Sequence, residues 1–143
     1  MKLLDANILL HAYNPDFSDH PKARAWLEAT LSGEEPVALA WATILAFLRI
    51  CTNPRAFPTP LSPADAASVV SGWLERSQVT ILQPGPRHWE ILQPLLSTAQ
   101  ARADLVTDAH LAALALEHGA VVCTNDRDFA RFQKVRTLDP LGS

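Results

Sequence analysis

The stretch LVTDAHLAALALEHGAVVCTNDRDF, residues 105–129, places a helix, a glycine stop and a buried strand in direct succession. Apolar residues surround most of the predicted helix, which indicates burial between other elements, and Gly119 is typical of a helix C-terminus. The run AVVCT at 120–124 predicts a short buried strand, and a short helix is expected to start within NDRDFARF. A buried helix that leads into a buried strand is typical of a parallel α/β sheet.

The rest of the chain repeats this alternation. Further strands are expected at 2–4, 37–41, 79–84 and 135–138, and a turn is expected at Asp5-Ala6-Asn7. Helices are predicted at 18–33, 42–54, 61–77 and 86–100, where Pro94 is expected to kink or divide the last one. Crossover connections of this kind favour one α/β domain, residues 1–143, with a central parallel sheet covered on both faces.

Composition narrows the class of protein. Hydrophobic residues make up 48% of the chain and charged residues 19%, as in soluble globular proteins. No run reaches the roughly 18 apolar residues of a membrane span, and no cleavable signal follows Met1, so a cytoplasmic protein without a membrane partner is expected. Cys51 and Cys123 lack metal or redox spacing and are expected to be buried, reduced thiols.

Basic residues are concentrated near the C-terminus although the net charge is −3. The cluster is compatible with a phosphate-facing patch and equally with an ordinary solvated surface. Its members are Arg127, Arg131, Lys134 and Arg136.

Aspartates occupy the predicted strand and helix ends. Asp5 ends the first strand, and Asp126 and Asp128 follow the strand at 120–124. Ligands of open parallel sheets bind outside the carboxyl ends of the strands, so these side chains are expected to approach one another. Asp108 lies near the start of the buried helix, where the helix dipole contributes only about 0.3–1 kcal/mol and a buried, unpaired charge costs several times more.

Convergence of these four acids predicts a cation. Two carboxylates about 4 Å apart repel by roughly 1 kcal/mol in water and about 4 kcal/mol near a protein surface. Oxygen ligands without converging His or Cys suit Mg²⁺ or Mn²⁺, which polarise phosphoryl oxygens and activate water. The predicted metal ligands are Asp5, Asp108, Asp126 and Asp128.

Each acid also has an ordinary structural interpretation. Asp5 with Asn7 forms an Asx-turn, Asp108 is a first-turn helix residue, and Asp126 caps the short helix that Asp128 continues. Asp104 lies one turn before Asp108 and joins the site if the helix extends that far back; it is otherwise interpreted as a solvated loop residue. Other polar and aromatic residues are expected to be structural, with His110 in packing, His118 exposed, and the four tryptophans facing the core: Trp26, Trp41, Trp73 and Trp89.

The segments LLDANILLHAY, FLRICTNPRAF, DAHLAALALEHGA, TNDRDF and the closing DPL resemble the PIN-domain ribonucleases, specifically VapC-type toxins of bacterial toxin–antitoxin pairs. The resemblance implies a three-layer α/β/α fold and Mg²⁺- or Mn²⁺-dependent endonuclease hydrolysis of RNA. It also implies a homodimer and a VapB-type antitoxin partner. By position, Asp5, Asp108 and Asp126 correspond to the family's catalytic acids, with Asp128 as a further metal ligand. Asn7 and Thr124 correspond to the supporting polar residues.

One position departs from the family pattern. Ala46 stands where the family has a glutamate before Phe-Leu-Arg, which implies weaker metal binding and impaired cleavage. On a buried helix an alanine is otherwise ordinary. The alternatives are a catalytically inactive antitoxin-binding module and a phosphoryl-transferring hydrolase with an aspartate nucleophile on the first strand.

Overall fold

A computed structural model describes residues 1–142, and Ser143 lies outside the described part. Its single five-stranded sheet has the order β3-β2-β1-β4-β5, and each neighbouring pair is parallel. The strands are β1 (Lys2–Leu4), β2 (Val37–Leu39), β3 (Val79–Ile81), β4 (Val121–Cys123) and β5 (Thr137–Leu138). The helices are α1 (Ala6–Tyr13), α2 (His20–Ser32), α3 (Trp41–Cys51), α4 (Pro63–Leu74), α5 (His88–Thr98), α6 (Asp104–His118) and the 3-10 helix η1 (Arg127–Arg131).

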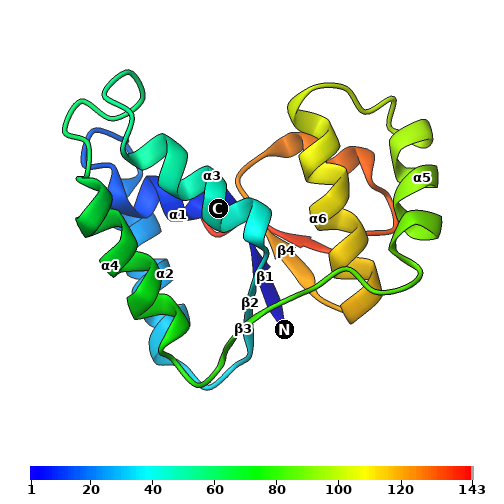
Figure 1. Cartoon of the computed structure of the whole chain (residues 1–143), viewed down its shortest axis with the longest axis horizontal. Helices are drawn as coiled ribbons and strands as arrows, with labels where there is room; N and C mark the ends of the chain where they lie inside the picture. The colour runs from blue at the N-terminus through cyan, green and yellow to red at the C-terminus, as the bar shows by residue number, and fades with distance from the viewer. Residues whose placement is uncertain (143) are drawn as a thin grey trace.

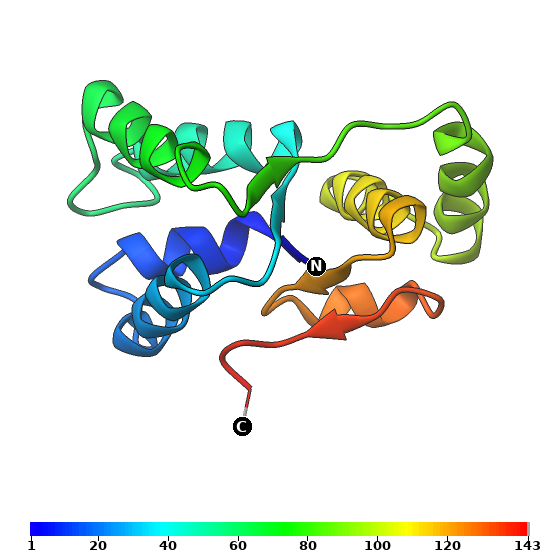
Figure 2. The same ribbon diagram turned by 90° about the horizontal axis from the view of Figure 1, so that it is seen from below.

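Helices cover the sheet on both sides, which makes a three-layer α/β/α fold. The helices α1 to α4 pack on one face, and α5, α6 and η1 pack on the other (Figures 1 and 2). Successive strand residues point to opposite faces, so Leu4 belongs to the first core cluster and Leu3 to the second. The predicted fold class is therefore confirmed.

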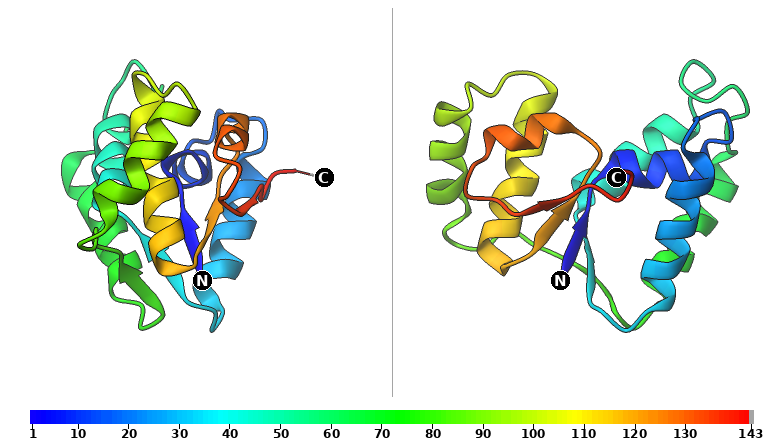
Figure 3. Two further views of the ribbon diagram at one scale, coloured as in Figure 1. Left: turned by 90° about the vertical axis from the view of Figure 1, so that its right-hand side faces the viewer. Right: turned by 180° about the vertical axis from the view of Figure 1, so that it is seen from behind.

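The first core cluster contains an aromatic group. Phe47 lies with its ring centroid 4.7 Å from that of Trp73 and 5.6 Å from that of Tyr13, in edge-to-face geometry. These three rings join α1, α3 and α4, and Phe47 has no exposed surface. The C-terminal segment crosses behind this layer (Figure 3), where the Leu141 carbonyl accepts a hydrogen bond from Lys22 Nζ at 3.0 Å.

Local sequence signals explain two of the helix ends. The Ser62 hydroxyl accepts from the Asp65 amide at 3.1 Å, which caps α4. At the end of α6, Gly119 adopts φ +67°, a left-handed conformation that glycine tolerates without steric cost. The end of α6 at Gly119 agrees with the prediction.

Several sequence predictions were wrong in detail. Trp41 and Trp89 do not face the core, since they are 48% and 61% exposed. Residues 5–7 do not form an isolated turn, because Asp5 is the N-cap of α1, whose buried face packs in the first core cluster. Asp104 is the first residue of α6 and not a loop residue, although it is exposed as expected. The expectation that Pro94 divides α5 was wrong: the helix continues through it, although the proline removes one backbone hydrogen bond, and leucines of α5 pack against the second cluster.

Candidate functional site

The site lies where the strand order reverses. From β1 the chain builds β2 and β3 on one side, and then returns to place β4 on the other. The connections diverge at the carboxyl ends of β1 and β4, which leaves a crevice between them. Asp5 follows β1 at this point, and its backbone amide donates to the Cys123 carbonyl at 3.0 Å.

Thr124 fixes the carboxylate of Asp5. The Thr124 hydroxyl donates to Asp5 Oδ2 at 2.8 Å, and the Ala6 amide donates to Asp5 Oδ1 at 2.7 Å. The same hydroxyl accepts from Asn7 Nδ2 at 3.2 Å and from the Asp126 amide at 3.0 Å. One buried threonine thus ties the segments after β1 and β4 together.

Three of the four predicted acids meet in one pocket. A pocket of about 490 Å³ is lined by residues that include Asp5, Asp108 and Asp126, from three separate parts of the chain. Asp104 also lines it, one turn before Asp108 on α6. Asp128 does not line it; its side chain is 61% exposed, and Oδ1 lies 4.0 Å from Arg131 Nε.

The capping interpretation of Asp126 is correct as well, because Asp126 Oδ1 accepts from the Asp128 amide at 2.9 Å. Asp126 therefore both begins η1 and lines the pocket. The structural and functional interpretations do not exclude each other at this position.

The negative charges around the pocket oppose ionisation of its carboxyl groups. Burial, followed by the charges of Asp5, Asp126, Asp128 and Asp104, raises the pKa of Asp108 to about 7. Burial also raises the pKa of Asp5, although the hydrogen bonds from Thr124 and Ala6 counteract part of the effect. Among residues 1–142, no ion pair involves Asp5, Asp108 or Asp126.

The carboxylates are near one another but not gathered around a point. Within the described chain, no three His, Cys, Asp or Glu side chains are spaced closely enough to hold a metal ion as they stand. The hydrogen bonds of Asp5 and Asp126 orient these side chains in the present conformation.

Helix α3 forms the wall opposite α6. Its lining residues include Thr43, Ala46 and the cationic Arg49. Ala46 lies in the pocket as the family pattern implies, and its methyl group leaves the wall open there. Thr43 was missed by the sequence analysis, and its buried hydroxyl is one of two buried side-chain polar groups without a hydrogen-bond partner in residues 1–142.

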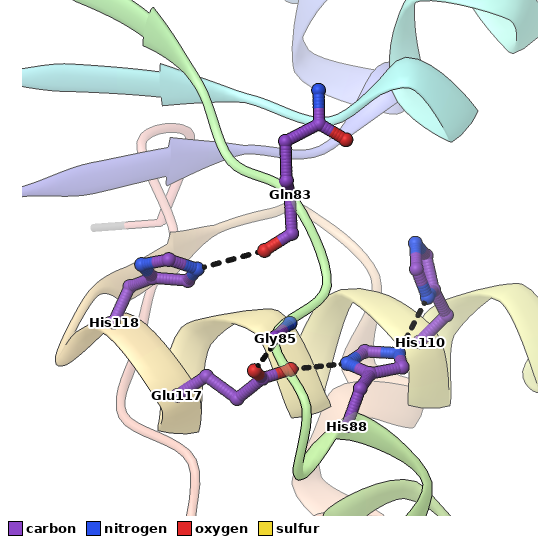
Figure 4. Close-up of polar contacts among 6 residues, drawn as sticks. All are labelled: Gln83, Gly85, His88, His110, Glu117 and His118. Carbon is purple, nitrogen blue, oxygen red and sulfur yellow. Dashed lines mark hydrogen bonds and ion pairs between the residues drawn. The ribbon is translucent and has the colours of Figure 1, made fainter.

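A second polar cluster supports α6 from behind (Figure 4). The Glu117 carboxylate accepts a hydrogen bond from the Gly85 amide at 2.8 Å and pairs with His88 Nδ1. The other ring nitrogen of His88, Nε2, lies 2.9 Å from His110 Nδ1. Burial favours a higher pKa for Glu117, but the bonds from His88 and Gly85 outweigh it and lower the pKa. Two residues apart on a helix, Asp108 and His110 point to opposite sides, so this cluster anchors the helix that carries Asp108.

His110 is therefore more than a packing residue, and the sequence contains no signal for this network because its members are 22 and 29 residues apart. His118 is exposed as expected, and its Nε2 lies 3.1 Å from the Gln83 carbonyl oxygen. Cys51 and Cys123 are both buried and free, as predicted.

The four residues of the predicted basic cluster are all exposed, but two of them are held by hydrogen bonds to backbone carbonyls. Arg131 and Arg136 donate to the backbone carbonyls of Ala99 and Gly119, at 3.5 and 3.2 Å. Arg127 and Lys134 are exposed. None of the helices in residues 1–142 has the length and apolar character that a bilayer span requires.

Comparison with known proteins agrees with this arrangement. A family described as "PIN domain" matches residues 2–135. Ribonuclease VapC37 of Mycobacterium tuberculosis (strain H37Rv) is 42% identical over 140 residues, covering 98% of this chain and 97% of the relative. Ribonuclease VapC31 of the same strain is 41% identical over 143 residues, covering 98% and 99%.

Solved structures share the fold at low sequence identity. VapBC-1 from nontypeable Haemophilus influenzae matches with a TM-score of 0.70 at 16% identity, over 99% of this chain and 98% of that chain. VapBC2 from Rickettsia felis, bound to a promoter DNA fragment, matches with a TM-score of 0.68 at 15% identity, over 96% of each chain. The chain therefore belongs to the PIN-domain family and, within that family, to the VapC type.

Proposed function

We propose that this chain is an endoribonuclease toxin of a VapBC-type pair, which hydrolyses RNA phosphodiester bonds with Mg²⁺ or Mn²⁺. The relatives named ribonucleases VapC37 and VapC31 support the reaction class. The observation that carries the proposal is the convergence of Asp5, Asp108 and Asp126 on one pocket, although Asp5 lies more than 100 residues before the other two. We also propose that residues 1–143 form one domain.

The pocket suits a divalent ion by the chemistry of its donors. Four aspartates and one arginine line it, so the ionised pocket has excess negative charge, and hard oxygen ligands favour Mg²⁺ or Mn²⁺. The raised pKa of Asp108 reflects the same repulsion, which a cation would relieve. Asp5, Asp108 and Asp126 would hold the ion once their carboxylates move closer together, with Asp128 contributing directly or through water.

An ion held by these residues would supply polarisation of a phosphoryl oxygen and activation of a water molecule. The residues of the chain position the carboxylates and the RNA. Thr124 and Ala6 hold the Asp5 carboxylate, and Asp108 holds or releases a proton near neutral pH. Arg49, on the opposite wall, neutralises an RNA phosphate at the pocket, and the exposed Arg127 and Arg131 neutralise phosphates farther along the strand.

Cleavage by this chain is expected to be impaired, because Ala46 offers no carboxylate where α3 faces the acids. The test compares RNA cleavage by the wild type and Ala46→Glu in Mn²⁺ and in EDTA. We expect Ala46→Glu to cleave faster in Mn²⁺ only. Ala67→Glu is the matched control, since it adds the same charge at an exposed position of α4 that does not line the pocket, and should not increase cleavage.

Absence of cleavage by both the wild type and Ala46→Glu, across metals and RNA substrates, would contradict the proposed reaction. That result would favour the second candidate, a catalytically inactive module that binds and sequesters its antitoxin. Ala46 is the feature that favours this alternative.

We further propose a VapB-type antitoxin as the protein partner, since solved neighbours include VapBC complexes. A groove of about 310 Å³ between α1, α2 and α4 offers an apolar floor and a buried Trp73 indole N–H without a partner. An antitoxin segment with an apolar side chain and a carbonyl acceptor fits this groove.

A homodimer is proposed through exposed apolar side chains beside the acidic pocket. Trp41 and Leu45 on α3 are 48% and 59% exposed, and Val106 on α6 is 43% exposed. Leu45 itself lines the pocket, so a partner copy at this surface would border the site.

A further inference from the structure

The Thr43 hydroxyl is unusual because it is buried without a partner. Thr43 is 2% exposed, and its Oγ1 makes no hydrogen bond in residues 1–142. An unsatisfied buried hydroxyl costs roughly as much as a lost hydrogen bond, so a protein retains one only when something compensates. Thr52, near the other end of the same helix, has no such defect, because its hydroxyl donates to the Leu48 carbonyl at 2.7 Å.

The location of Thr43 indicates what the partner is. Thr43 lines the acidic pocket together with Asp5 and Asp108. It lies three residues before Ala46, which also lines the pocket, so the two side chains share one face of α3. Ala46 ends at a methyl group, so it supplies no polar partner to the threonine.

A pocket of about 490 Å³ with several carboxylates is polar and large enough for ordered water. A water molecule there needs two to four polar partners, which the threonine and the acids supply together. The oxygen of Thr43 is covered at present, but threonine in a helix populates two χ1 rotamers, and a rotation turns the hydroxyl without moving the backbone.

We propose that Thr43 is a positioning residue of the acidic site: when a divalent ion binds, the Thr43 hydroxyl rotates toward the pocket and binds a water molecule beside Ala46, which orients the acids around the ion. This inference rests on the proposed metal-dependent function. It predicts opposite effects of one substitution: removal of the hydroxyl relieves a buried, unpaired group in the ion-free protein and weakens ion binding.

The test uses Thr43→Val, which keeps the shape of the side chain, with Thr43→Ser to restore the hydroxyl. In the ion-free protein, we expect Thr43→Val to raise the midpoint of thermal unfolding by about 2–4 °C. In calorimetric titration, the same variant should bind Mn²⁺ roughly tenfold more weakly, the size typical of lost supporting contacts around metal ligands. Thr43→Ser should bind Mn²⁺ like the wild type.

Thr52→Val is the matched control. It removes a hydroxyl that has a partner, so it should lower the unfolding midpoint and leave Mn²⁺ binding unchanged. A wild type that binds no Mn²⁺ would overturn the proposed function and this inference with it. A wild type that binds Mn²⁺ with the same affinity as Thr43→Val would overturn only the role of Thr43. Destabilisation by Thr43→Val would also overturn it, since the hydroxyl would then have a protein partner in solution.

Discussion

Neutralising Asp108 should stabilise the ion-free protein, and the effect should grow with pH. The carboxyl has a pKa of about 7 in the folded protein against 3.8 as the reference value. Between these values the folded state keeps a proton that the unfolded state has lost, so stability falls as pH rises through this window. Asp108→Asn removes this ionisable group. The gain in unfolding free energy of the variant over the wild type therefore reaches its full size at pH values above the folded pKa of about 7.

The magnitude follows from the size of the pKa change. Roughly three pKa units at about 1.36 kcal/mol each set an upper limit near 4 kcal/mol. Asp108 is only half-buried and solvent screens its charge, so we expect about 1–2 kcal/mol. For a chain of this length that corresponds to an unfolding midpoint about 3–6 °C higher.

The assay is urea unfolding in EDTA at about pH 5 and about pH 8, with the exposed Asp16→Asn as control. The difference between Asp108→Asn and the wild type should be larger at the higher pH, and the control should show no such trend. Addition of Mn²⁺ should then stabilise the wild type more than Asp108→Asn. A difference that does not change with pH, or a variant less stable than the wild type at about pH 8, would refute the argument.

Other features of the structure lead to three more predictions. Glu117→Gln should lower the free energy of unfolding in urea by about 1–3 kcal/mol at neutral pH. Because the pKa of Glu117 in the folded protein is lowered from 4.5, this loss of stability should disappear as the pH falls through the lowered pKa. A loss that is the same at every pH would contradict this prediction. In thermal unfolding, Ala103→Gly should stabilise the protein and Gly119→Ala should destabilise it, by about 1 kcal/mol each. The reason is that φ is +50° at Ala103 and +67° at Gly119. If both variants changed stability in the same direction, backbone strain would be excluded as the cause. Leu45→Glu should convert the proposed dimer to a monomer in light scattering, whereas Leu138→Glu, at an equally apolar position 40% exposed on β5, should not; an intact Leu45→Glu dimer would place the interface elsewhere.

Much of this protein is determined locally and can therefore be inferred from the sequence. The Ser62-Pro63 start of α4 and the Gly119 end of α6 depend on contacts within one turn, so their residue types identify them. The alternation of helices and strands fixes a parallel sheet, and a parallel sheet brings the ends of its strands to one edge. That topology brings Asp5, Asp108 and Asp126 to the same pocket.

Tertiary packing decided the rest. Pro94 lies inside an unbroken α5 because leucines on that helix contact the second core, an effect that local propensity does not contain. Asp128 does not line the pocket although it is two residues from Asp126; its exposed carboxylate lies 4.0 Å from Arg131 Nε, yet its charge still helps to raise the pKa of Asp108. The unpaired hydroxyl of Thr43 and the Glu117–His88–His110 network depend on which groups from distant segments come within hydrogen-bond distance. Hydrogen bonds between side chains are short-ranged and directional, so only the folded chain determines which of them form.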